Sequence, residues 1–281
     1  MKPSRAGTIV RALTIIFVIL WSAAPIYAGL VTSLSRQTDV QAVPAHWWPS
    51  PVRLDAYRDI LPGAEGPTPE APAFIRAMLN SVEIAGGATV LILLLSVGSG
   101  YAFNRLRFPG RRLLLVAIVG TLVIPLFAVI VPLFRIMSTW HLIDTRIGLL
   151  LLYVTAYAPL GIWLFYNYAA ALPAEIEEAA LVDGCSRVQA LLRVLVPQMT
   201  PGIAALGAIL LLSTWGEFLI PLIFATTSDT HPVTVTITDF VGKYTVNIPL
   251  MMSAGIMSLI PPAVVAFYLN RHIRSMLAGW Y

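Results

Sequence analysis

Six stretches of apolar residues, each long enough to cross a lipid bilayer, constrain this chain more than any other feature. A helix that crosses the hydrocarbon core needs about 20 predominantly apolar residues. Because no water pairs with the backbone there, such stretches must be helices or strands of a closed barrel. The period-two alternation that a barrel requires is not evident. The predicted helices are Ile9–Leu34, Leu79–Phe103, Leu113–Met137, Ile147–Tyr168, Pro201–Phe224 and Met251–Asn270.

The composition supports a membrane protein. Of the 281 residues, 58% are hydrophobic and only 11% are charged, and the mean hydropathy is +0.80. Soluble domains contain about 25% charged residues, so lipid must act as the solvent for much of this surface. The net charge of +4 does not indicate nucleic-acid binding, because the arginines lie in short clusters beside the apolar stretches, as membrane topology demands.

The beginning of the chain is similar to a secretory signal peptide, because Lys2, Arg5 and Arg11 precede an apolar stretch with a weak cleavage site. That stretch continues from about Ala12 to Leu34. It exceeds the usual apolar region of a signal peptide and suits a full membrane span. We therefore expect it to be retained as the first transmembrane helix.

The distribution of basic residues predicts the orientation. Eleven of the eighteen lysines and arginines lie at one set of helix ends, and the segment Asn104–Arg112 holds four of them. Because basic residues favour the cytoplasmic side, we expect both termini in the cytoplasm. The same rule makes residues 35–77 an irregular, proline-rich external loop, residues 169–196 a cytoplasmic loop, and residues 225–249 an external loop with β-favouring residues at Val233–Ile237.

Several kinds of chemistry are not expected of this chain. Its two lysines, Lys2 and Lys243, precede neither serine nor threonine, so it has no P-loop and another polypeptide must bind any ATP. The single cysteine, Cys185, excludes an internal disulfide. The four histidines show no metal-ligand spacing, and no nucleophile–base pair indicates an enzyme.

The cytoplasmic loop contains the most informative segment, beginning with a predicted short helix. Pro173 suits its first turn, where a missing N–H costs nothing. Three glutamates follow within Glu175–Glu178, near the positive end of the helix dipole. Ala179 and Ala180 favour helix continuation, and Asp183-Gly184 ends the helix with a residue suited to a left-handed cap.

A second short helix is predicted directly after this turn. Ser186 suits its N-cap, Val188, Leu191, Leu192 and Leu195 lie on one face, and Pro197 is expected to end it before the next span. From the residues alone, two interpretations remain open. The helix pair is either an amphipathic loop on the lipid headgroups or a docking surface for another protein.

This segment resembles the EAA motif of importer permeases in the ATP-binding-cassette superfamily. The motif positions are Glu178-Ala179-Ala180, then Gly184 after three residues, then Val194–Pro197 after nine more, with Val194 and Val196 replacing the usual Ile and Leu. The form Leu-Pro-x-Glu-x-x-Glu-Ala-Ala-x-x-Asp-Gly resembles the carbohydrate, maltose-permease-like branch. Trp215-Gly-Glu-Phe218 is similar to that family's Trp-Asn-Glu-Phe.

The resemblance implies an all-α type I importer permease that transports a sugar or oligosaccharide. It implies a second permease, two ATPase subunits that bind ATP–Mg, and an external solute-binding protein; no cofactor is expected on this chain. The predicted ATPase-coupling residues are Glu178, Ala179, Ala180, Asp183, Gly184 and Pro197. By analogy Glu178 pairs with a basic residue of the ATPase, and Gly184 permits close approach.

Other residues are weaker candidates. Glu83, Trp215 and Glu217 lie in or near spans and are candidates for the translocation pathway or gate, because charges in membranes are often functional. An interfacial role for Glu83 and a packing role for Glu217 remain open. The small residues of Ser96–Gly100 favour close helix packing.

Two alternatives remain open for the function. The first is an importer permease for another solute, such as a polyamine, phosphate or glycerol phosphate. The second is a stand-alone secondary transporter, which would favour ionisable residues deep within the spans and an internal repeat.

Overall fold

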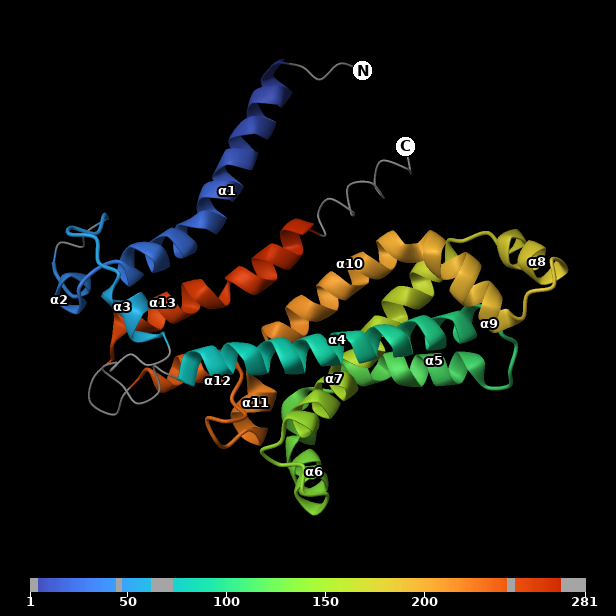
Figure 1. Cartoon of the computed structure of the whole chain (residues 1–281). Helices are drawn as coiled ribbons and strands as arrows, with labels where there is room; N and C mark the ends of the chain where they lie inside the picture. Colours follow the sequence, from blue (N-terminus) through green and yellow to red (C-terminus); the bar gives the residue numbers. More distant parts are fainter. Residues whose placement is uncertain (1–4, 44–46, 62–72, 242–245, 269–281) are drawn as a thin grey trace. The chain divides into compact units, whose positions relative to one another are not determined.

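The computed structural model describes residues 5–43, 47–61, 73–241 and 246–268. Within these ranges the regular structure is helical, apart from one isolated antiparallel β-bridge between Val241 and Val246. The elements labelled in Figure 1, with the two short elements η2 and η3, are α1 (Arg5–Ser33), α2 (Gln37–Val40), α3 (Asp55–Asp59), α4 (Phe74–Arg105), α5 (Arg111–Gly120), η2 (Thr121–Val123), α6 (Leu126–Thr139), α7 (Arg146–Ala170), α8 (Glu175–Val182), α9 (Arg187–Ala190), η3 (Leu191–Leu195), α10 (Val196–Trp215), α11 (Leu219–Phe224), α12 (Val233–Asp239) and α13 (Ile248–Ser258).

The structure contains the predicted apolar helices. In the described ranges, five continuous helices are long and apolar enough to cross a membrane, and one bent pair brings the number to six. The continuous helices cover Gly7–Ser33, Phe74–Arg105, Arg146–Ala170, Arg187–Trp215 and Ile248–Tyr268. Lys243 and the C-terminal tail after Tyr268 lie outside the described residues.

The predicted third span is not one continuous helix. The chain bends by 102° between Arg111–Val123 and Leu126–Thr139 (Figure 1). Pro125 causes the break, because a residue before proline is driven out of the helical region; Ile124 accordingly has an extended ψ of 118°. The uninterrupted span Leu113–Met137 was therefore the wrong prediction.

Both predicted ends of the fifth span, Pro201 and Phe224, were also wrong. Its helix begins at Arg187 and runs to Trp215, so Pro197 does not separate the short helix from the span. Pro197 removes one backbone donor, and the helix accommodates it with a π-helical turn, η3, directly before α10. At the other end, the chain leaves the helix at Gly216 and starts α11 at Leu219.

The chain divides into two compact units, and residues 1–76 with 236–260 form the first. There α1 packs on α13, where a Cβ on Gly29 would contact Ile256 at 3.7 Å. Gln37 fixes the connection after α1, because its side chain accepts from the Ile248 amide at 3.0 Å and donates to the Val246 carbonyl at 2.7 Å. This connection was predicted to be irregular, but its described part contains α2 and α3.

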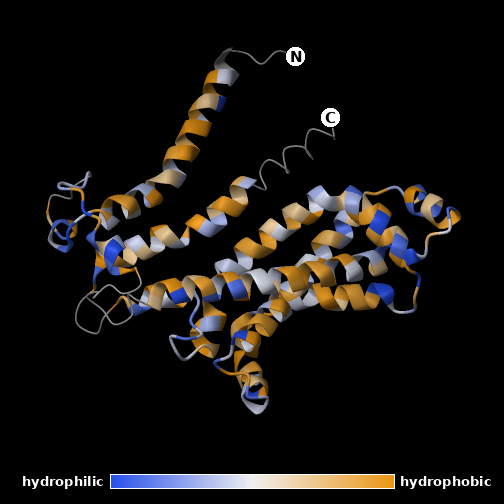
Figure 2. Cartoon of the chain, in the orientation of Figure 1, coloured by the Kyte–Doolittle hydropathy of each residue, from blue (hydrophilic) through white to orange (hydrophobic). Residues whose placement is uncertain are grey.

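Residues 77–235 with 261–281 form the second unit. Its core lies among α4, α7 and α10, with Ile92, Phe165 and Leu210 buried. Close helix contact is confirmed for two of the predicted small residues: a Cβ on Gly161 would collide with Ser96, and one on Gly100 would collide with Phe165, whereas Gly98 has open space around its Cβ. In Figure 2, hydrophobic residues dominate α5, α7 and α10, whereas hydrophilic residues gather near α8, α9 and the start of α5.

The second unit has two ends with different connections. At one end, Nη2 of Arg105 donates to the Leu172 carbonyl at 2.7 Å, which joins the α4–α5 connection to the α7–α8 connection. At the other end, Arg146 pairs with Glu83 at 3.1 Å. The alternation of connections agrees with the predicted topology. Which end faces the cytoplasm stays a prediction.

The connection 225–249 differs from the sequence prediction. Val233–Ile237 was predicted to favour β structure, but it lies in α12. Strand propensity depends strongly on context, and here the Val233 amide donates to Ser81 Oγ at 2.8 Å while Thr234 Oγ1 donates to the Glu217 carbonyl at 2.9 Å. These bonds anchor the start of a helix rather than a strand.

Candidate functional site

The turn between α8 and α9 is held by capping hydrogen bonds on both sides. At the end of α8, the Cys185 amide donates to the Ala180 carbonyl at 3.0 Å and the Gly184 amide to the Leu181 carbonyl at 3.1 Å, which is the Schellman pattern. Gly184 has a φ of +88°, so the prediction of a left-handed glycine cap is confirmed.

The start of α9 confirms the predicted Ser186 cap. Ser186 Oγ accepts from the Gln189 amide, while Gln189 Oε1 accepts from the Ser186 amide at 2.8 Å, forming a capping box. The prediction that Pro173 lies in the first turn of this helix was wrong, since Pro173 precedes the N-cap Ala174 and lies outside α8. With both ends of the turn capped, α8 and α9 form a preformed pair.

Glu177 anchors this helix pair to α4. Its side chain is only 6% exposed; Oε1 accepts from the Tyr101 hydroxyl at 2.6 Å, and the carboxylate pairs with Arg105 at 3.5 Å and Arg187 at 3.7 Å. A buried carboxylate requires such partners. The contact therefore connects α8 directly to the end of a 32-residue helix.

Sequence reasoning missed the role of Glu177 because three glutamates occur within four residues. The signal that separates them is helical spacing. Glu177 and Ala180 are the buried residues of α8 and lie three positions apart, whereas Glu178 is exposed.

The opposite face of the helix pair is exposed and partly apolar. Glu178, Ala179, Asp183 and Gly184 are exposed, and the neighbouring apolar side chains Val182, Val188 and Leu192 are 86%, 65% and 58% exposed. Of the predicted coupling residues, Ala180 is buried against the chain itself, and exposed Pro197 lies beyond the turn. The prediction that these six residues contact an ATPase stays a prediction.

Glu217 organises a second polar group at the other end of the unit. Its Oε1 accepts from the amides of Phe218, Leu219 and Ile220 at 3.0–3.2 Å, which caps α11, and its Oε2 accepts from the Tyr157 hydroxyl at 2.5 Å. Tyr157 and Glu217 line a mostly apolar cavity of about 430 Å³ between the bent α5–α6 pair, α7 and α11.

The structure does not bring the other pathway candidates together with the helix pair. Glu83 forms an exposed ion pair with Arg146, and Trp215 is half-buried. Along α4, Glu83 and Tyr101 are roughly 27 Å apart at the α-helical rise per residue. The candidates thus form two groups at opposite ends of the unit.

Asp144 is a second residue that sequence reasoning missed. Its carboxylate accepts from the amides of Thr226 and Thr227 at 2.9 and 3.1 Å, and from the hydroxyls of Thr227 and Thr230. Burial raises its pKa, but these hydrogen bonds outweigh that effect and lower the pKa from 3.8 to about 2. Asp144 thus fixes the connection after α11.

Solved chains of two ABC transporters share the fold of this chain. A solved chain of the bacterial ABC transporter that imports the acidic polysaccharide alginate has a TM-score of 0.79 and 22% identity, with 96% of this chain and 98% of that chain covered. A chain of the methionine ABC transporter has a TM-score of 0.56 and 17% identity, over 72% of this chain and 94% of that chain.

This chain belongs to the family of binding-protein-dependent transport system inner membrane components, whose profile matches residues 92–277. An osmoprotective compounds uptake permease protein of Synechocystis sp. is 36% identical over 72% of this chain and 69% of its own length. The trehalose transport system permease protein of Mycobacterium tuberculosis is 32% identical over 77% of both chains. The family and the apolar helices make this a multi-pass cell-membrane permease, as predicted.

Proposed function

We propose that this permease imports a sugar or oligosaccharide and that the α8–α9 pair docks on an ATPase subunit. The observation that carries the docking is the two-sided construction of α8. Glu177 attaches one face to α4, while the other face presents Glu178 and the exposed Val182.

This construction supports the transmission of motion from a docked protein. A ligand or partner shifts a conformational equilibrium only through contacts that differ between two states. Capping bonds at Gly184 and Ser186 keep the turn from deforming under such a contact. Movement of the docked protein would therefore pass through Glu177 to α4.

The proposed complex contains a second related permease, two ATPase subunits that bind ATP–Mg, and an external solute-binding protein. The substrate class rests on relatives whose names include trehalose, diacetylchitobiose and alpha-glucoside transport. The chain itself would provide alternating access and no bond-breaking chemistry.

Site-specific cross-linking tests the docking. In a Cys185→Ser background, Val182→Cys introduces a single thiol at a side chain that is 86% exposed. Val123→Cys is the matched control, because Val123 is 84% exposed on η2, outside the helix pair. We expect Val182→Cys, but not Val123→Cys, to cross-link to a P-loop ATPase co-expressed from the same operon.

Transport by the purified complex tests the substrate class. The test uses proteoliposomes that contain the complex together with its binding protein. They should accumulate radiolabelled trehalose or maltose only when ATP is present on the side of the membrane that carries the ATPase subunits. ATP-dependent uptake of spermidine or glycerol phosphate instead would replace the sugar assignment. Uptake by the chain alone, without ATP and without a cross-linked ATPase, would establish a stand-alone transporter.

A further inference from the structure

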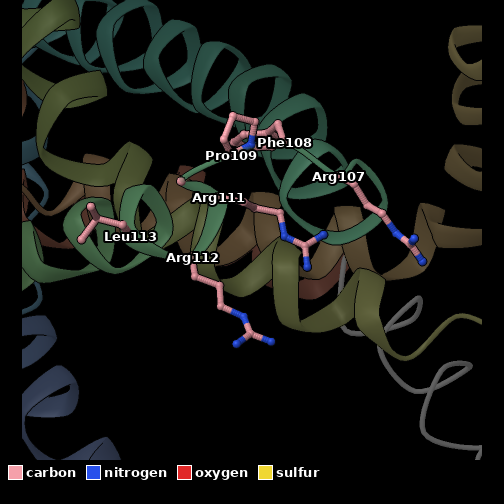
Figure 3. A pocket seen from close by; sticks show the side chains of 7 residues that line it. Arg107, Phe108, Pro109, Arg111, Arg112 and Leu113 are labelled. Atoms are coloured by element: carbon pink, nitrogen blue, oxygen red, sulfur yellow. The ribbon is translucent and has the colours of Figure 1, made fainter.

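The connection between α4 and α5 forms a basic hollow beside the apolar helices. It is lined by Arg107, Phe108, Pro109, Arg111, Arg112 and Leu113 (Figure 3). Gly110 shapes the turn with a φ of +76°, a conformation that favours glycine. In Figure 3 the three arginine side chains extend to the same side of this connection.

The positive charges of this hollow are not neutralised within the described part of the chain. Arg107 and Arg112 are exposed, and Arg111 Nη1 donates to the Leu106 carbonyl at 2.9 Å, which orients its guanidinium group. Among the described residues, the ion pairs involve other arginines: Arg53, Arg105, Arg146 and Arg187. Three guanidinium groups that have no carboxylate partner among the described residues create a local preference for an anion.

Apolar side chains extend away from the hollow along α5. Leu113 and Val116 are 76% and 68% exposed, and α5 has no buried residue. On the other side, Phe108 packs on Phe103 of α4 with ring centroids 5.9 Å apart. The arginines of the hollow thus lie next to an apolar surface that runs along the membrane helix α5.

We propose that Arg107, Arg111 and Arg112 bind the headgroup of an anionic glycerophospholipid whose acyl chains lie along α5. Guanidinium groups bind phosphate oxygens with paired hydrogen bonds, and basic clusters beside transmembrane helices attract anionic lipids. A free phosphate ester would engage only the arginines, with no part of the same molecule along Leu113 and Val116. A lipid satisfies both parts of the surface.

Native mass spectrometry of the full chain tests this proposal. The chain is purified in a zwitterionic detergent and titrated with dioleoyl phosphatidylglycerol or dioleoyl phosphatidylcholine. We expect selective binding of phosphatidylglycerol that weakens as ionic strength rises. In the double variant Arg107→Gln/Arg112→Gln, affinity should fall about 30-fold, which corresponds to about 1 kcal/mol for each charge. Both side chains are exposed, so the variant should fold.

The matched control removes two exposed arginines elsewhere, Arg58→Gln and Arg135→Gln, and should bind phosphatidylglycerol like the wild type. Wild-type affinity in the first double variant, or equal binding of phosphatidylcholine, would overturn the proposal. Displacement of the lipid by free glycerol phosphate would replace it with a soluble phosphate ester. Loss of the lipid when ATPase subunits bind would identify the hollow as a protein interface instead.

Discussion

The hydroxyl of Tyr101 donates a hydrogen bond of 2.6 Å to Glu177, although 76 residues separate them in the sequence. Tyr101 lies near the end of α4, and Glu177 lies on the buried face of α8. The bond therefore joins a membrane helix to the proposed docking element, and it makes separate roles for Glu177 and its neighbour Glu178 testable.

Glu177→Gln should destabilise the permease by roughly 1–3 kcal/mol, because the amide cannot satisfy the charge of Arg105. It should also reduce transport per ATP hydrolysed, since α8 is less firmly held. Thermal unfolding of the purified chain and paired uptake and ATPase assays measure the two effects.

The control for this prediction is Glu178→Gln. Glu178 is exposed, so this variant should keep the wild-type unfolding temperature and weaken ATPase association instead. Equal losses of stability in both variants would show that the buried position of Glu177 does not distinguish it from its neighbour.

Gly184→Ala should cost about 1–2 kcal/mol, because Gly184 has a φ of +88° and a left-handed conformation is unfavourable with a Cβ. Apart from its chain neighbours, no described residue places an atom within 4 Å of that Cβ, so the cost is conformational rather than steric. Gly184→Asn should therefore recover part of the loss. Thermal unfolding and ATPase co-purification measure the effect.

Gly98→Ala is the matched glycine control. Gly98 lies within α4 and also has open space around its Cβ, but the helical backbone accepts alanine readily. It should be neutral or slightly stabilising. If Gly184→Ala and Gly98→Ala behave alike, backbone conformation does not explain the glycine at position 184.

The local signals of the helix pair were readable from the sequence. The left-handed cap at Gly184 and the N-cap at Ser186 each depend only on residues close by in the sequence, so both caps could be predicted. The apolar spans were predictable for a similar reason, because length and composition define them. The family motif then identified a function that these local features alone left open.

Contacts between distant segments account for what was missed. Helical spacing places Glu177 on one face with Ala180, but only the contacts with Tyr101 and Arg105 show what that face binds. Likewise, the residues of Val233–Ile237 favour β structure by themselves, and the hydrogen bond from the Val233 amide to Ser81, which is distant in the sequence, is visible only in the structure. Both Pro125 and Pro197 would be expected to break a helix. The chain bends at Pro125, whereas a π-helical turn accommodates Pro197 within a continuous helix. The effect of each proline therefore depends on the surrounding packing.

Asp144→Asn should loosen the connection at residues 226–230 near neutral pH. The folded protein holds the pKa of Asp144 at about 2, below its ordinary 3.8, so its carboxylate contributes stability above pH 3.8. That contribution declines as pH falls toward 2. Asparagine still tolerates the φ of +57° at this position, so the variant tests charge and hydrogen bonding rather than backbone strain.

Hydrogen exchange of the Thr226 and Thr227 amides measures this effect. Both amides donate to Asp144, so they should exchange faster in Asp144→Asn at neutral pH. The difference between variant and wild type should shrink as the pH is lowered toward 2. A difference that persists unchanged at low pH would contradict the assignment of the effect to the ionised carboxylate.

Glu217→Ala should destabilise the permease more than Glu217→Gln. The carboxylate caps three amides at the start of α11 and also accepts from Tyr157. Alanine removes the cap, at about 1–2 kcal/mol, whereas the glutamine carbonyl still accepts from those amides. Tyr157→Phe should cost about 1 kcal/mol and show less additional effect in a Glu217→Ala background, since the shared bond is already absent.

Glu83→Gln provides the control for that series, because it removes a carboxylate at the same end of the unit whose ion pair with Arg146 is exposed. Exposed pairs contribute about 0–1 kcal/mol, so the unfolding temperature should change little. Thermal unfolding of the whole series in one detergent orders the variants. Glu217→Gln could instead prove as damaging as Glu217→Ala while Glu83→Gln remains neutral. Charge in the cavity would then matter more than the helix cap, which would favour the gate interpretation of Glu217 over the packing interpretation.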